Sequence, residues 1–157
     1  KEFESRTEYA NYFNSKYDLE KEKIYFLPEN EIGRFFRYIS KNKVSYFYGI
    51  TLNDSIKIDD PFLNENNSCS GRISGIIHGQ EKDYNTVPTQ LATFSFENIN
   101  QEKLDISKGK SVIFLVSTQL GRSNNKTIKE LSTEVKALNN PNINYYFLSV
   151  DNSYIGN

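Results

Sequence analysis

Residues 112–116, Val-Ile-Phe-Leu-Val, are the most apolar segment of the chain and constrain its fold most strongly. The side chains of a β-strand point alternately to its two faces, so an uninterrupted apolar run requires both faces to be buried. We therefore predict that residues 111–117 form a central strand of a sheet, covered on both sides, rather than an edge strand.

Several other short stretches, rich in aromatic and β-branched residues, have the pattern of strands. Polar loops with turn-forming residues separate them, and residues 64–70, Asn-Glu-Asn-Asn-Ser-Cys-Ser, are the clearest of these loops. A length of 157 residues fits one domain. The additional predicted strands are residues 34–39, 44–50, 55–58, 72–77, 91–96 and 143–150.

The first 23 residues instead have the spacing of a helix that buries one face. We predict an N-terminal amphipathic helix within residues 1–27, closed by Pro28, and a single β-rich domain over residues 28–157. The helix is expected to pack on the domain or to precede it as a stalk, and a partner-binding helix is the alternative. Its apolar face comprises Phe3, Ala10, Phe13 and Tyr17.

A second helix is predicted over residues 126–139. It begins with a Thr-x-x-Glu capping box at residues 127–130 and stops at Asn-Asn-Pro, residues 139–141. Residues 121–125 are predicted to be a loop. With the strands on either side, this helix makes a βαβ crossover or lies across the end of an antiparallel barrel, and the spacing fits both. The inward residues are Ile128, Leu131, Val135 and Leu138.

Composition excludes several classes of function. The net charge of −1 excludes a uniformly basic nucleic-acid coat protein, so any such binding requires a local patch. One Cys cannot form an internal disulfide, and with one His it supplies too few ligands for a metal cluster. We expect neither a metal nor a cofactor. No apolar run approaches the roughly 18 residues of a membrane-spanning helix.

Candidate catalytic groups are few. Cys69 and His78 suggest a nucleophile–base pair, but Cys69 lies in a polar loop without a nearby base, so His78 is interpreted as a surface or structural residue. Residues 109–111, Gly-Lys-Ser, lack the earlier glycine and the following helix of a phosphate-binding loop. A non-catalytic protein is therefore expected, and an enzyme of unfamiliar type is the least favoured reading.

The strongest local feature is the segment of residues 33–48, where cations alternate with aromatic residues and no acidic residue occurs. Cations attract phosphates, and aromatic faces stack bases at roughly 1–3 kcal/mol each. A hairpin of residues 34–39 and 43–50 would place some of both groups on one face. Alternatively, several aromatics lie in the core with the cations at its rim. The candidate nucleic-acid-binding residues are Arg34, Phe36, Arg37, Tyr38, Lys41, Lys43, Tyr46 and Tyr48.

The segment of residues 33–48 resembles the first hairpin of cold-shock-type OB domains, with a Gly, an aromatic strand, a Lys/Asn turn and a second aromatic strand. Phe94, Phe96 and residues 109–116 resemble later strands of that family. In the latter segment, Gly109, Val112, Phe114 and Val116 fit its spacing. The glycines of the family's first RNA-contacting motif and the His of its second are absent. The resemblance implies an OB-like barrel that binds single-stranded nucleic acid.

These observations together predict an α+β fold. It is a mostly antiparallel β-barrel or curled sheet, OB-like, with a helix at the N-terminus and another near the C-terminus. The function predicted is non-catalytic binding of single-stranded nucleic acid, RNA in particular, through a basic-aromatic strand surface. The alternative is an exported or envelope protein of sensor, inhibitor or immunity type that binds a protein or small ligand. A cytoplasmic location is favoured, and a periplasmic or secreted one if the precursor carries a signal or anchor.

Overall fold

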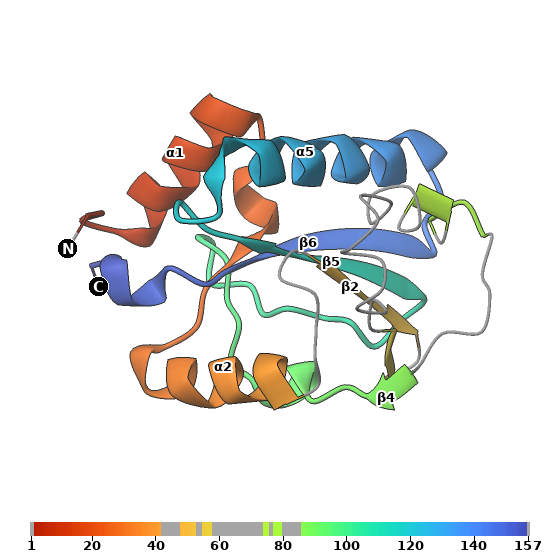
Figure 1. Cartoon of the computed structure of the whole chain (residues 1–157), viewed down its shortest axis with the longest axis horizontal. Coiled ribbons are helices and arrows are strands. Elements are labelled where there is room, and N and C mark those ends of the chain that lie inside the picture. The colour runs from red at the N-terminus through yellow and green to blue at the C-terminus, as the bar shows by residue number, and fades with distance from the viewer. Residues whose placement is uncertain are drawn as a thin grey trace.

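A computed structural model describes residues 2–41, 48–52, 55–57, 74–75, 77–79 and 86–156. In these residues an open, mixed β-sheet lies between two layers of helix (Figure 1). Helices α1 and α5 cover one face of the sheet, and α2 covers the other. The helices are α1 (Arg6–Tyr17), α2 (Ile32–Lys41) and α5 (Gly121–Leu138), and the short 3-10 turns are η1 (Lys21–Lys23), η2 (Glu29–Glu31), η3 (Leu91–Thr93) and η4 (Asn152–Tyr154).

The order of strands in the sheet is β1-β6-β5-β2-β3-β4. Strands β1, β6 and β5 run parallel, whereas β2, β3 and β4 extend the sheet in antiparallel fashion beyond β5. The parallel pair β5 and β6 is joined by α5, which makes a βαβ unit. The strands are β1 (Ile24–Tyr25), β2 (Tyr48–Leu52), β3 (Ser55–Lys57), β4 (Thr86–Pro88), β5 (Lys110–Val116) and β6 (Ile143–Ser149).

The core on the α1/α5 face is largely aromatic. The Phe114 and Phe147 rings of neighbouring strands stack with their centroids 5.7 Å apart. Tyr9 and Phe13 of α1 pack with centroids 4.9 Å apart, and both side chains are fully buried. Such rings bury a large area each, which allows a chain with 37% hydrophobic residues to form a dense core. From α5, this core receives Ile128, Leu131 and Val135.

The core on the opposite face is built around Phe35 of α2. Its ring lies edge-on to those of Phe94 and Phe96, at 5.3 and 5.2 Å between centroids. Phe94 and Phe96 belong to an irregular segment that follows η3, so α2 is covered by loop residues as well as by the sheet. From the sheet, this second core receives Tyr25, Ile113, Leu115 and Leu148.

The structure contradicts the predicted antiparallel barrel. Its sheet is open, and three of its strands are parallel, so the OB-like architecture is wrong. Of the two arrangements left open for the C-terminal helix, the βαβ crossover is the one present. The predicted central strand is confirmed, because β5 lies between β6 and β2 and its residues from Ser111 to Val116 are all buried.

Some of the individual helices and strands were predicted correctly and others were not. Strands were correctly predicted at β3 and β6, and helices at α1 and α5, although α5 begins at Gly121 rather than at residue 126. The first helix ends at Tyr17, well before Pro28, and residues 24–25 belong to β1. Residues 34–39 are helical rather than extended, as are Ser74, Gly75 and Ile77, and Leu91–Thr93 is a 3-10 turn. The apolar residues at positions 32, 35, 38 and 39 follow a helical period, which explains α2.

Candidate functional site

Most of the predicted nucleic-acid-binding residues lie on α2 rather than on a strand. Arg34, Phe36, Arg37, Tyr38 and Lys41 all fall within Ile32–Lys41. Lys43 and Tyr46 lie outside the described residues, and Tyr48 is the first residue of β2. The proposed hairpin face is therefore wrong for residues 34–39. A helix distributes its side chains around an axis, so these residues cannot form the flat stacking platform of a strand surface.

The side chain of Arg34 holds α2 in place through contacts within the protein. Its guanidinium donates to Glu31 Oε1 at 3.0 Å, to Thr93 Oγ1 at 2.9 Å and to the Thr93 carbonyl at 3.0 Å. It also lies 3.8 Å from the centroid of the Phe94 ring, a close cation–π contact. With its donors occupied within the protein, Arg34 is a structural residue that ties α2 to η3.

Tyr38 also belongs to the interior. It is buried, its hydroxyl lies 3.2 Å from Thr89 Oγ1, and its ring lies 5.8 Å from that of Phe94. Burial raises the pKa of the Tyr38 hydroxyl. For Arg34 and Tyr38, the alternative of core aromatics with cations at the rim is therefore the correct one.

The remaining side chains form the outer face of α2, defined here as Gly33, Phe36, Arg37, Ser40 and Lys41, all exposed. Phe36 keeps 45% of its surface exposed, which is unusual in a chain that buries most of its Phe residues. Arg37 and Lys41 have no ion-pair partner within the part of the chain that the structure describes. The outer face thus combines an exposed aromatic ring with two cations, Arg37 next to Phe36 in sequence and Lys41 one turn further along the helix.

Of the two candidate catalytic residues, the structure describes His78. His78 lies with Nε2 at 3.5 Å from Glu134 Oε2, and the Ser74 hydroxyl donates to the same oxygen at 2.6 Å. These contacts attach the short helical segment around Ser74 to α5. Cys69 lies outside the described residues. The structural role predicted for His78 agrees with its contacts.

Sequence reasoning missed a buried polar cluster at the carboxyl ends of β5 and β6. Asp151 is only 1% exposed. Its carboxylate accepts hydrogen bonds from the hydroxyls of Tyr9 at 2.8 Å and Ser117 at 2.6 Å, and from the backbone N–H of Thr118 at 2.8 Å. Burial, followed by the charge of Asp151, raises the pKa of the Tyr9 hydroxyl well above its ordinary value.

The Asp151 cluster joins α1 to the ends of two parallel strands, near the two chain termini (Figure 1). All of its donors are neutral, and the carboxylate is shielded from solvent, so the cluster acts as a structural connection rather than as an open site. The signal that could have identified it is the polar residue at the end of each strand, Ser117 and Asp151, because carboxyl ends of parallel strands meet at one edge of a sheet. An antiparallel prediction separated these two positions.

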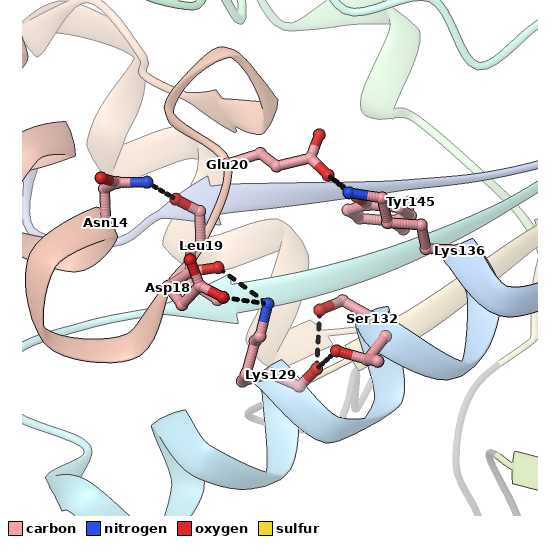
Figure 2. A network of polar contacts seen from close by, with 9 residues as sticks. Asn14, Asp18, Leu19, Glu20, Lys129, Ser132, Lys136 and Tyr145 are labelled. Atoms are coloured by element: carbon pink, nitrogen blue, oxygen red, sulfur yellow. Dashed lines mark hydrogen bonds and ion pairs between the residues drawn. The ribbon is translucent and has the colours of Figure 1, made fainter.

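A second polar network fastens the end of α1 to α5 and β6 (Figure 2). Asp18 has a left-handed backbone with φ of 57°, and its carbonyl accepts from Lys129 Nζ at 2.8 Å. Glu20 Oε1 accepts from Lys136 Nζ at 2.9 Å and from the Tyr145 hydroxyl at 2.6 Å. Burial alone would raise the pKa of Glu20, but these hydrogen bonds from Tyr145 and Lys136 outweigh it, and the pKa is lowered.

Beside this network lies an open pocket of about 230 Å³ between the end of α5 and the start of β6. Its wall combines three amide side chains, one ammonium and one phenol with three apolar residues, so it is mixed in polarity. In the described residues, no group of three or more His, Cys, Asp and Glu side chains is placed to hold a metal ion. The pocket is lined by Val135, Lys136, Asn139, Asn140, Pro141, Ile143, Asn144 and Tyr145.

Comparison with known proteins gives no family for this chain: no family model, curated protein or solved structure matches it. The resemblance to cold-shock domains therefore has no support beyond the residues that suggested it, and the open sheet contradicts the barrel that it implied. Among the described helices, none is long and apolar enough to cross a membrane.

Proposed function

We propose that this chain is a non-catalytic binding protein that docks an acidic segment of a partner protein on the outer face of α2. The observation that supports the proposal is the exposed Phe36 ring on the same outer face as Arg37 and Lys41, neither of which has an ion-pair partner in the described residues. Aromatic residues and Arg are enriched among the residues that dominate protein interfaces.

The charge of the partner follows from the composition of α2. Residues 32–41 contain three cations and no carboxylate, and the preceding Glu31 is paired with Arg34 at 3.0 Å. The outer face therefore has a positive charge, and a complementary partner offers Asp or Glu side chains around an apolar residue that covers Phe36. A protein partner is also the alternative that the sequence offers.

Single-stranded nucleic acid, the partner that the sequence predicted first, is less well suited to this surface. Stacking on a strand platform was the basis of that prediction, and Tyr38 is buried while Phe36 is the exposed ring on α2. Loss of charge on α2 would weaken the binding of either kind of partner, but the affinity for nucleic acid depends more steeply on salt concentration. Nucleic acid is therefore kept as one arm of the test.

The test is fluorescence anisotropy at low ionic strength with a labelled Glu-rich peptide containing leucines, and in parallel with a labelled single-stranded oligonucleotide. We expect the peptide to bind, Phe36→Ala to weaken binding by about tenfold or more, and the double change Arg37→Gln with Lys41→Gln to slow association. The matched control is Arg122→Gln with Lys126→Gln, which removes two exposed cations from α5 and leaves the affinity unchanged.

Two results would contradict the proposal. One is the absence of peptide binding at millimolar concentration and low salt. The other is tight binding of the oligonucleotide with a salt slope that falls by roughly 1.4 when Arg37 and Lys41 are both neutralised, as expected for two contacts with single-strand phosphates.

A further inference from the structure

The strand β6 has one edge that is only partly covered. On one side it pairs along its whole length with β5, but on the other side β1 pairs only with Phe147 and Leu148. Among the described residues, no strand pairs with residues 143–146 on that side. The far side of the β1 segment, away from β6, is covered instead, because Phe26 exchanges two backbone hydrogen bonds with Glu97, at 2.8 and 3.0 Å. Among the described residues, the first half of β6 thus has no strand partner on the β1 side, and only the turn η1 lies beside it.

The sequence of β6 makes this stretch prone to strand pairing. It reads Ile-Asn-Tyr-Tyr-Phe-Leu-Ser, with no charged residue, Pro or Gly. Short segments of high β-propensity without charge are those that associate when an edge is exposed. The net charge of the whole chain is −1, so repulsion between copies is weak and protection of the edge must be local.

Lys23 lies on this edge of β6. Its Nζ is 5.0 Å from the centroid of the Tyr145 ring and 5.0 Å from that of Tyr146. Neighbouring residues of a strand point to opposite faces, and here Tyr145 belongs to the α1/α5 core while Tyr146 packs against the α2 core. An ammonium that contacts both rings must therefore lie beside the backbone, at the edge between the two faces.

The surroundings hold Lys23 in this position. Lys23 is the last residue of η1 (Lys21–Lys23), and β1 begins at the next residue. The side chain of Lys23 therefore lies beside the part of β6 that β1 does not pair with. Glu20 accepts hydrogen bonds from Tyr145 and from Lys136, the latter visible in Figure 2, and its negative charge also attracts the Lys23 ammonium. Burial lowers the pKa of Lys23, as expected for an ammonium packed against two rings.

We propose that the edge of β6 at residues 143–146 is a strand-pairing surface for a second copy of this chain, and that Lys23 keeps it closed. A second copy related by a two-fold axis would present the same edge and pair β6 with β6, which would join two sheets into one. Each Lys23 would then be buried in the new contact, close to the ammonium of the other copy. An unpaired buried charge is costly, so the monomer is favoured.

The test is sedimentation velocity of wild type and of Lys23→Thr over a range of concentrations. Thr is neutral, short and favourable in strands. Wild type should sediment as a monomer of 18.2 kDa. Lys23→Thr should form a dimer, with a dissociation constant at least about tenfold lower than that of wild type. Lys23→Arg, which retains the charge, should remain monomeric.

The matched control is Lys16→Thr. Lys16 also places its Nζ over two tyrosine rings, those of Tyr12 and Tyr17 at 5.2 and 5.6 Å, but it lies on α1 and not at an edge of the sheet. This variant should stay monomeric. Hydrogen exchange should also show that backbone amides of residues 143–146 gain protection in the Lys23→Thr dimer.

Three results would overturn the inference: a folded Lys23→Thr that stays monomeric at every concentration, a wild-type protein that already dimerises through this edge, or a dimer whose new protection lies elsewhere. Circular dichroism establishes whether Lys23→Thr is folded. If it is not, Lys23→Gln, which keeps most of the length of the side chain, is measured in its place and is held to the same outcomes.

Discussion

The helices α5 and α2 cover opposite faces of one sheet, but they use their cations differently. On α5, Lys129 and Lys136 are paired with Asp18 and Glu20 from the end of α1, at 3.2 and 2.9 Å. On α2, Arg37 and Lys41 have no such partner among the described residues, and an exposed Phe36 lies beside them. Lys129 and Lys136 thus fasten α5 to the end of α1, whereas the outer face of α2 keeps two cations without a described ion-pair partner. We infer that the first serves stability and the second serves binding.

The largest expected effect is on the α1/α5 core. Phe114→Ala removes a fully buried ring that stacks on Phe147, and it should lower the free energy of unfolding by about 3–5 kcal/mol through lost burial and a cavity. Urea unfolding followed by tyrosine fluorescence or circular dichroism measures this loss. A change within error of zero would show that β5 is not a covered central strand.

The charged substitution Leu131→Asp tests the helix that covers this core. Leu131 is buried on α5, and an unpaired carboxylate there cannot be solvated. We expect the domain to unfold or to loosen, with loss of hydrogen-exchange protection along α5. Protection equal to that of wild type would contradict the inward position of Leu131.

A smaller effect is expected at the buried polar cluster. Tyr9→Phe removes the hydroxyl that donates to Asp151 at 2.8 Å and keeps the ring that packs on Phe13. A buried hydrogen bond to a charged group contributes about 1.5–3 kcal/mol, so the free energy of unfolding should fall by that amount. Lys41→Gln on the outer face of α2, which removes a charge without a described ion-pair partner, should change the free energy of unfolding by less than about 0.5 kcal/mol.

Acid should weaken the fastening of α1 to α5. The pKa of Glu20 is lowered in the folded protein from its ordinary value of 4.5, so its contribution to stability is present above that value and is lost as the pH falls through the folded pKa. Wild type should therefore lose more stability on acidification than Glu20→Gln does. Thermal unfolding across this pH range measures the difference, and parallel curves for the two proteins would contradict the role given to Glu20.

The parts of the fold that could be predicted from sequence are those where the spacing of apolar residues fits only one kind of element. The run of residues 112–116 required a covered strand, and the spacing of Ile128, Leu131 and Val135 required a helix. The parallel pairing of β5 with β6 was one of two arrangements that the sequence left open, because closely linked strand, helix and strand fit both a crossover and a helix across the end of a barrel. Without it, Ser117 and Asp151 could not be brought together.

The candidate site was predicted in composition but not in geometry. Three of the six residues 34–39 are aromatic and a fourth is Ile, and such residues favour strands, so this segment had the composition of a strand. The helical period of Ile32, Phe35 and Tyr38 was the competing signal, and burial against Phe94 and Phe96 decides in its favour. Tertiary packing overrides intrinsic propensity here, and it leaves Phe36 and Arg37 outside.

The claim that the α2 face binds a partner while the α5 face serves stability is tested most directly by heteronuclear NMR. The labelled protein is titrated with the Glu-rich peptide. The account predicts that the backbone amide shifts change most at the outer face of α2, at Gly33, Phe36, Arg37, Ser40 and Lys41, and little in α5. Saturating peptide that leaves these amides unmoved, or that shifts the amides of α5 and β6 instead, would contradict it.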